Sequence, residues 1–169
     1  MKKLSATVIL LISIGCYAQK SELVADNATL TLVAADYEFT EGPAMAKNGD
    51  VYFTDQPNNR IIKWNASDNS VAVYIEEAGR ANGLYFDHDG SLLACADENF
   101  ELWKIDKNKN HVVLVDEFQG KKLNGPNDLW VDLKGGIYFT DPYYQRPYWE
   151  RKEKEIEEER VYYLNPDRN

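Results

Sequence analysis

Residues 127–141 read Asn-Asp-Leu-Trp-Val-Asp-Leu-Lys-Gly-Gly-Ile-Tyr-Phe-Thr-Asp, and this stretch determines the predicted fold class. Leu129 and Val131 alternate with Trp130 and Asp132, which is the period of a strand with two different faces. The Lys-Gly-Gly run predicts a tight turn, because glycine reaches positive φ without a Cβ clash. The β-branched and aromatic residues that follow predict a returning strand, which the next proline ends.

The same pattern occurs twice earlier, in residues 41–55 and 82–97. The distance from the first residue to the turn glycine is 8 in each copy (41 to 49, 82 to 90 and 127 to 135). Two further strand-like stretches follow each of the first two copies, at 61–64 and 71–75 and at 101–105 and 112–115. Four strands in a period of roughly 40–45 residues predict an all-β fold, a β-propeller of four-stranded blades.

The repeat boundaries place the predicted blades near residues 36–78, 79–119 and 120–169. The third copy departs from the other two, because an aromatic and charged stretch, residues 142–160, separates its second strand from the next strand at 160–164. If this insertion lies at the mouth of the central channel, rings such as Tyr143 and Tyr144 can stack on a sugar. A packed surface loop with a solvated charged face is the alternative.

Three equivalent positions begin the copies, namely Glu41, Asn82 and Asn127. In a propeller, residues at the start of the innermost strands surround the central channel. One carboxylate and two amide oxygens around one axis suit Ca²⁺, and less often Mg²⁺. The alternative interpretation is that these residues only shape the turn that enters each blade.

Several motifs resemble the gluconolactonase/regucalcin (senescence marker protein) family: Phe-Thr-Glu-Gly-Pro at 39–43, Asn-Gly-Pro-Asn-Asp-Leu at 124–129 and Gly-Gly-Ile-Tyr-Phe-Thr-Asp-Pro at 135–142. The likeness covers about residues 36–169. It implies a six-bladed propeller, with a divalent metal in the channel, that hydrolyses sugar lactones. This chain then holds about three to three and a half blades, and we expect the N-terminal part of a propeller, an apparent fragment.

The resemblance also implies roles for individual residues. Glu41 matches the metal-binding glutamate of the family, and Asn127 matches an asparagine at the metal and substrate site. Two further metal ligands, and most plausibly the general base, belong to later blades. Asp128 is a candidate base beside the axis, or else a carboxylate that points into the blade and binds backbone. Weaker candidates are Asn82 as ligand or water holder and, lining the substrate site, Asn124, Asp141, Tyr143 and Tyr144.

The expected activity is opening of a lactone ring by water, with a metal polarising the carbonyl group. Ca²⁺ is the expected ion, with Zn²⁺, Mg²⁺ and Mn²⁺ left open. Regucalcin-like members carry an arginine two residues before the Asn127 position, whereas this chain has Gly125, so the substrate preference is not transferred. The alternatives are a non-catalytic propeller module, an inactive fragment, or an organophosphate or ester hydrolase on the same scaffold.

The N-terminus has the pattern of a secretory signal peptide over residues 1–18, ahead of a lead-in segment, 19–35. A short basic start precedes the apolar run at 7–14, which is too short to span a bilayer. Small residues near Ala18 predict cleavage after it, and a lipid on Cys16 is the alternative. We therefore expect an exported protein, periplasmic or secreted, with no membrane partner after cleavage. Leu30 to Val33 is a candidate outer strand.

The composition excludes some partners. The formal net charge of −9 argues against a nucleic-acid partner, which requires basic patches. Loss of Cys16 leaves Cys95, which we interpret as a small buried hydrophobe. The sequence does not predict an oligomeric state. The blade pattern predicts a core made of Phe53, Trp64, Leu84, Phe86, Leu93, Trp103, Leu129, Val131, Tyr138 and Phe139.

We predict that exported protein begins at Gln19. Mass spectrometry of the secreted or periplasmic chain should find that residue at the N-terminus, with or without cyclisation. An intact Met1, or a lipid attached to Cys16, would contradict the assignment.

Overall fold

A computed structural model of the 169-residue chain describes residues 23–25 and 27–167. The predicted signal peptide and Cys16 lie outside these residues. The chain divides into two units at residues 32 and 33, and within the described residues every sheet lies in the second unit. In the described part of the chain, no helix has the length and apolar character needed to cross a bilayer.

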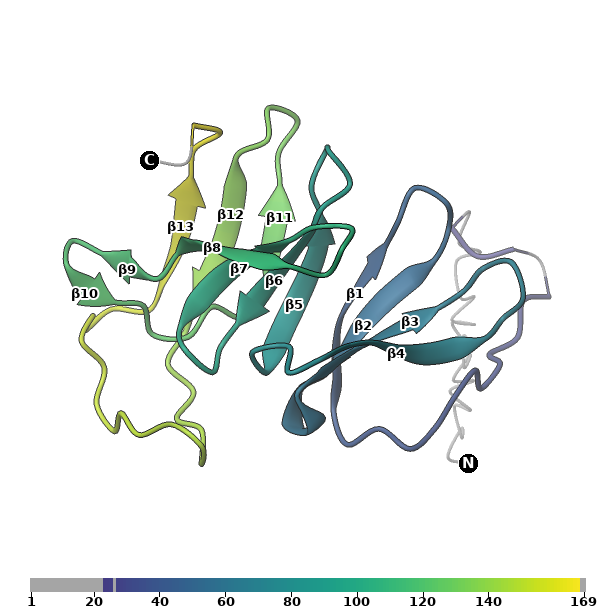
Figure 1. Ribbon diagram of the computed structural model, residues 1–169, viewed down its shortest axis with the longest axis horizontal. Helices are drawn as coiled ribbons and strands as arrows, with labels where there is room; N and C mark the ends of the chain where they lie inside the picture. Colours follow the sequence, from purple (N-terminus) through teal and green to yellow (C-terminus); the bar gives the residue numbers. More distant parts are fainter. Residues whose placement is uncertain (1–22, 26, 168–169) are drawn as a thin grey trace, which may run out of the picture. The chain divides into compact units, whose positions relative to one another are not determined.

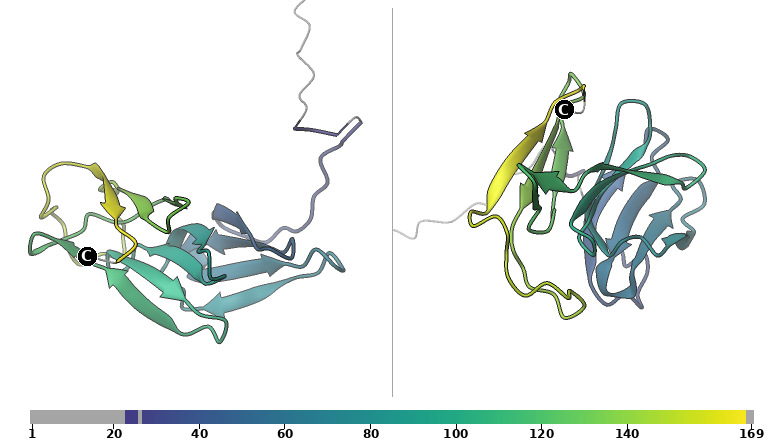
Figure 2. Two further views of the ribbon diagram at one scale, coloured as in Figure 1. Left: turned by 90° about the horizontal axis from the view of Figure 1, so that it is seen from above. Right: turned by 60° about the vertical axis from the view of Figure 1, so that its left-hand side comes forward.

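Two four-stranded antiparallel sheets form the first two blades, and their strands follow chain order. The first sheet contains β1 (Thr40–Met45), β2 (Val51–Asp55), β3 (Arg60–Trp64) and β4 (Val71–Glu76). A 3₁₀ turn, η1 (Gln56–Asn58), joins β2 to β3. The second sheet contains β5 (Ala81–Phe86), β6 (Leu92–Ala96), β7 (Glu101–Ile105) and β8 (His111–Val115). Both match the predicted blades, and the second sheet lies between the other two in Figure 1 and in the left view of Figure 2.

The third sheet has three strands, β11 (Leu129–Val131), β12 (Ile137–Asp141) and β13 (Arg160–Leu164), with β12 in the middle. A small ribbon of β9 (Glu117–Phe118) and β10 (Lys121–Lys122) precedes it. The insertion, residues 142–160, joins β12 to β13 without a helix, and its charged half is largely exposed. The candidate outer strand at 30–33 pairs with no strand among the described residues, so it stays a prediction.

The aspartate that closes the second copy lies one position later than its counterparts, 7 residues after Gly90 instead of 6 after Gly49 or Gly135. Asp55 ends β2 opposite Thr40, whereas Ala96 takes the corresponding place opposite Ala81. Asp97 therefore lies one position beyond the residue that Asp55 represents. This single-residue shift gives Asp97 a different set of partners.

The core consists of two clusters, one between the first and second blades and one between the second and third. Cys95 is fully buried in the second cluster, as expected, and burial raises the pKa of its thiol above the ordinary value. Six of the ten predicted core residues are buried: Leu84, Leu93, Trp103, Leu129, Val131 and Phe139. Phe53, Trp64 and Phe86 are only partly buried.

Tyr138 contradicts the prediction, because 40% of it is exposed. Successive side chains of a strand point to opposite faces. Phe139 therefore enters the cluster shared with the second blade, while Tyr138 points to the other face of its sheet.

Neighbouring blades touch through their first strands. The Gly83 N–H donates to the Asn127 carbonyl oxygen at 2.7 Å. A Cβ on Gly83 would lie 2.7 Å from Asp128 Oδ1, and a Cβ on Gly42 would lie 2.5 Å from the Asn82 carbonyl oxygen. Only glycine permits such a close approach, so these residues set the spacing around the axis.

The Phe139→Ala variant should lose about 3–5 kcal/mol of unfolding free energy, because the substitution opens a cavity in the cluster between the second and third blades. Urea unfolding measures the change. Leu133→Ala is the matched control, since Leu133 is 96% exposed and its truncation should change stability by less than about 0.5 kcal/mol. Equal losses in the two variants would contradict this placement of the core.

Candidate metal and substrate site

A cavity of about 260 Å³ lies where the first strands of the three blades begin. Glu41 reaches it from β1, while Asn127 and Asp128 reach it from the segment that leads into β11. The two glycines at the contacts between blades also line it. The structure thus brings together three of the residues that the sequence marked as candidates.

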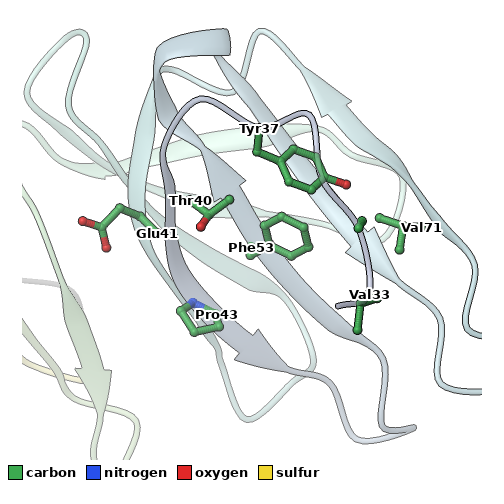
Figure 3. Close-up of a pocket in the computed structure, with 8 residues that line it drawn as sticks. Val33, Tyr37, Thr40, Glu41, Pro43, Phe53 and Val71 are labelled. Atoms are coloured by element: carbon green, nitrogen blue, oxygen red, sulfur yellow. The ribbon is translucent and has the colours of Figure 1, made fainter. Parts of the chain in front are cut away.

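Glu41 is partly exposed, and its carboxylate takes part in no hydrogen bond or ion pair with the part of the chain that is described. A separate hollow of about 450 Å³ adjoins it, lined by apolar side chains that include Tyr37, Phe53 and Val71. Figure 3 shows the carboxylate pointing away from these three residues. The charge of Glu41 is therefore available to a ligand.

Asn127 is held through its backbone. Its N–H donates to the Thr140 carbonyl oxygen at 3.0 Å, and its own carbonyl oxygen accepts from Gly83. No described residue forms a hydrogen bond with its side-chain amide. A fixed backbone with an unengaged amide oxygen is the arrangement that a ligand to a cation requires.

The Asp128 carboxylate both binds backbone and borders the cavity, the two arrangements that the sequence analysis left open. One carboxylate oxygen, Oδ1, accepts the Leu129 N–H at 2.8 Å, and the Asp128 N–H donates to Thr140 Oγ1 at 3.0 Å. The other oxygen, Oδ2, has no partner among the described residues, and the side chain borders the cavity. Asp128 is therefore oriented by backbone and keeps one oxygen available.

Asn82 does not join this group, although it occupies the equivalent position. It is 2% exposed, and its Nδ2 donates to Asp97 Oδ2 at 3.0 Å. Its side chain is not part of the cavity wall. The displacement of this aspartate by one position accounts for the difference, because it places the Asp97 carboxylate next to Asn82.

The donor set fits a hard cation only in part. Among the described residues, no group of three or more His, Cys, Asp or Glu side chains could hold a metal ion. Glu41 and Asn127 offer one carboxylate and one amide oxygen, both unengaged. Oxygen donors of this kind suit Ca²⁺ or Mg²⁺, whereas Zn²⁺ usually takes nitrogen or sulfur ligands.

Asp55 and Asp141 have structural roles. Asp55 accepts the N–H groups of Glu38 and Phe39, three and two residues before Glu41. Asp141 accepts the N–H groups at the same offsets before Asn127, those of Asn124 and Gly125. Each carboxylate thus holds the segment that leads into the first strand of its blade.

Burial and hydrogen bonding act differently on these two carboxyl groups. Burial dominates at Asp141 and raises its pKa, although both N–H bonds oppose this. At Asp55 burial has the same direction, but hydrogen bonds from Asn58, Arg60 and backbone outweigh it and lower the pKa. Asn124 is fully buried, so neither it nor Asp141 lines an open substrate site.

The insertion is anchored on Asp97, a residue that the sequence analysis did not select. Arg146 Nε donates to Asp97 Oδ2 at 3.0 Å, and the Tyr148 hydroxyl donates to Oδ1 at 2.6 Å. Trp149 Nε1 donates to the Asp97 carbonyl oxygen at 3.0 Å. The one-position displacement of Asp97 and the insertion itself were the signals available in the sequence, but neither indicates that Asp97 and the insertion meet.

Tyr148 connects the insertion to Asp97, Gln56 and Arg80. Burial raises the pKa of its phenol, and the bond to Asp97 adds to this, so the hydroxyl stays protonated and donates. Its oxygen accepts from Gln56, and the Arg80 guanidinium lies 4.3 Å from its ring centroid. The expected ring contacts with a sugar are not placed at the cavity, since neither Tyr143 nor Tyr144 borders it.

The structure gives a steric reason for the glycine at position 125. Its φ is +151°, and a Cβ there would lie 2.8 Å from Trp149 Cη2. The indole ring of the insertion therefore occupies the space that a side chain at this position needs. Arg151 reinforces the contact by donating to the carbonyl oxygens of Leu123 and Asn124 at 2.8 and 2.9 Å.

Residues 39–169 match the model of the family described as the SMP-30/Gluconolactonase/LRE-like region. Among curated proteins, the chain is 29% identical over 168 residues to a gluconolactonase of Zymomonas mobilis, with 89% of this chain and 47% of that protein covered.

Solved structures give the same relation. A gluconolactonase from Xanthomonas campestris is 28% identical, with a TM-score of 0.77 over 81% of this chain and 47% of its own. A second structure, described as that of a putative gluconolactonase, is 29% identical, with a TM-score of 0.75 over 81% of this chain and 49% of its own. The chain therefore spans about half the length of the relatives it matches, and its blades are part of a β-propeller.

The packing of the insertion is tested by Gly125→Ala, with Gly90→Ala as the matched control. Both glycines have positive φ, so both variants carry backbone strain of order 1–3 kcal/mol. A Cβ at residue 90 meets nothing within 4 Å, whereas one at 125 meets Trp149. Urea unfolding should show a further loss of about 1–3 kcal/mol for Gly125→Ala. Equal losses would show that the indole does not pack there.

Proposed function

This chain belongs to the SMP-30/gluconolactonase/LRE-like family, and on that premise we propose that it acts in the hydrolysis of sugar lactones. The observation that carries the proposal is the convergence of Glu41, Asn127 and Asp128 on one cavity. The relatives from Zymomonas mobilis and Xanthomonas campestris are gluconolactonases.

The proposed ion is Ca²⁺, held by the Glu41 carboxylate and the Asn127 amide oxygen. When bound, it supplies positive charge that polarises the lactone carbonyl group. Glu41 balances that charge, and Asn127 adds a neutral donor whose position is fixed by its two backbone hydrogen bonds. Ca²⁺ takes about 6–8 oxygens, so water completes the set around a single copy of the chain.

Asp128 is the proposed proton acceptor for the attacking water. Its Oδ1 is occupied by the Leu129 N–H, which fixes the plane of the carboxylate and leaves Oδ2 directed to other partners. A general base must be held within hydrogen-bond distance of the proton it removes. An exposed carboxylate that borders the cavity meets that requirement once substrate is bound.

We expect a single copy to bind Ca²⁺ at the millimolar level, because one carboxylate and one amide leave most of the coordination to water. Glu41→Gln should remove most of this affinity, since it deletes the charge and keeps the shape. Isothermal titration measures the change. Glu153→Gln, on the exposed part of the insertion, is the control and should bind as wild type does.

Turnover of a panel of aldonolactones, with and without Ca²⁺ or Zn²⁺, tests the activity itself. The chain alone should show little or no lactonase activity, and Glu41→Gln should remove any activity that the metal stimulates. An organophosphate and a simple ester in the same panel identify the other hydrolases expected from this scaffold. Micromolar Ca²⁺ binding that Glu41→Gln leaves unchanged would show that the site lies elsewhere.

A further inference from the structure

Asn82 and the residue after it contact both neighbouring blades. They lie near the start of β5, which runs between β1 and β11 (Figure 1). The Asn82 carbonyl oxygen accepts the hydroxyl of Thr54, from the first blade, at 3.0 Å. Gly83 donates its N–H to the Asn127 carbonyl oxygen of the third blade. A shift of the peptide between Asn82 and Gly83 therefore changes one contact with each neighbouring blade.

The contact with the first blade leads to Glu41. Glu41 pairs with Thr54 in the register of β1 and β2. Thr54 is fully buried, and so is its hydrogen bond to Asn82. The residue after Glu41 is Gly42, where a Cβ would lie 2.5 Å from the Asn82 carbonyl oxygen. Glu41 is thus connected to Asn82 both along its own strand and across the strand pair.

The contact with the third blade leads to Asn127. The Gly83 N–H donates to the Asn127 carbonyl oxygen at 2.7 Å, and a Cβ on Gly83 would lie 2.8 Å from that same oxygen. The two blades are therefore as close here as a glycine backbone permits. The backbone at residues 82 and 83 sets the spacing between the two proposed ligands of the ion, Glu41 and Asn127.

Asp97 holds the side chain of Asn82. Asn82 Nδ2 donates to Asp97 Oδ2 at 3.0 Å, and the two residues are 2% and 1% exposed. A buried carboxylate is costly unless its oxygens accept hydrogen bonds. Two further donors come from the insertion, since Arg146 Nε donates to Oδ2 and the Tyr148 hydroxyl donates to Oδ1. The insertion therefore helps to keep Asp97 where it binds Asn82.

The part of the insertion that binds Asp97 is itself fixed. The Tyr148 hydroxyl also accepts from Gln56, and the Arg80 guanidinium lies over its ring. Trp149 is 3% exposed and donates to the Asp97 carbonyl oxygen. All of these partners belong to the described blades, and together they make this part of the insertion a rigid support.

We propose that Asn82 is a positioning residue of the ion site, and that the insertion holds it in place through Asp97. Asn82 does not coordinate the ion but sets the distance between the Glu41 carboxylate and the Asn127 amide. A cation such as Ca²⁺ depends on that distance, because its oxygen ligands lie within about 2.3–2.6 Å. The insertion thereby tunes ion affinity from outside the cavity. This inference rests on the proposed function, which assigns the two ligands.

Tb³⁺ luminescence, with displacement by Ca²⁺, measures ion binding in the whole chain and in each variant. Tb³⁺ takes oxygen ligands as Ca²⁺ does, and its higher charge gives tighter binding. Circular dichroism verifies that each variant is folded at the temperature of the titration. A loss of affinity in folded protein reports the geometry of the site instead of the stability of the fold.

Asn82→Asp separates a positioning role from direct coordination, because the two roles predict opposite effects. A carboxylate that coordinated the ion would add negative charge and strengthen binding. A carboxylate beside Asp97 is repelled by it, so the pair separates and the spacing is lost. We expect the dissociation constant to rise by about tenfold or more, as for other residues that orient metal ligands. Unchanged or tighter binding would overturn the positioning role.

Tyr148→Phe tests the contribution of the insertion. The substitution removes one donor to Asp97, and the dissociation constant should rise by about threefold or more. Tyr163→Phe is the matched control, because the Tyr163 hydroxyl lies 3.3 Å from another aspartate, Asp132, in the turn between β11 and β12. That variant should bind as wild type does. Equal constants for Tyr148→Phe and Tyr163→Phe would overturn the role assigned to the insertion.

Two substitutions of Thr54 test the contact with the first blade. Thr54→Val removes the hydroxyl that donates to Asn82 and keeps the branched shape, so binding should weaken by about threefold or more. Thr54→Ser keeps the hydroxyl, so binding should return towards that of wild type. Equal weakening in both variants would show that the methyl group matters instead of the hydrogen bond, and would overturn this contact as a means of positioning.

Amide hydrogen exchange in EDTA, followed by NMR, tests the positioning without an ion. Exchange of the Gly83 N–H should accelerate by about threefold or more in Tyr148→Phe, because local opening at this contact becomes easier. The Asp87 N–H donates to Ser91 at the other end of the second blade, and its exchange should not change. Equal acceleration at both amides would show a general loss of stability. That result, or unchanged exchange at Gly83, would overturn the proposal.

The two measurements separate this inference from the proposed function. If Glu41→Gln leaves ion binding unchanged, the proposed function fails, because the ligands are assigned wrongly. The exchange of the Gly83 N–H in EDTA still decides whether the insertion positions the backbone at residues 82 and 83. If Glu41→Gln abolishes binding while Asn82→Asp and Tyr148→Phe bind as wild type does, the ion site stands and the positioning role is overturned.

Discussion

The close contact between the first strands of neighbouring blades is the constraint on which the rest of the structure depends. Gly83 donates its N–H to the Asn127 carbonyl oxygen, and both Gly42 and Gly83 lie where a Cβ would meet the next backbone. This spacing brings Glu41 and Asn127 to one cavity. It also sets how the outer parts of the sheets diverge, and so where the two apolar clusters form between blades.

Asp97 shows how a displacement of one position changes the role of a repeated residue. Asp55 and Asp141 each hold the segment that leads into their own blade, through two backbone N–H groups. Asp97, displaced by one position, instead binds Asn82, Arg146 and Tyr148. A carboxylate that shapes the entry turn in the first and third blades is thereby, in the second blade, the anchor of the connection between β12 and β13.

Much of the fold could be predicted from the sequence, because the recurrence of one pattern shows the length of the repeat. The turn glycines, the alternation within each strand and the resumed strand at β13 all lie where the pattern indicates. One residue of the predicted core, Tyr138, is exposed instead of buried. Tyr138 is apolar in a strand, yet its face has no neighbour among the described residues, and alternation alone does not say which face is covered.

The sequence by itself determined the four-strand period, the family motifs and the choice of Glu41 and Asn127, because these depend on residue type and spacing along the chain. Only the tertiary structure decided that Asn82 turns to Asp97, that Asn124 is buried, and that Trp149 occupies the space beside Gly125. Those outcomes depend on contacts between residues far apart in the chain. Asp97 lies one position later than its counterparts in the other blades. The local sequence pattern does not indicate which residues its carboxylate then contacts.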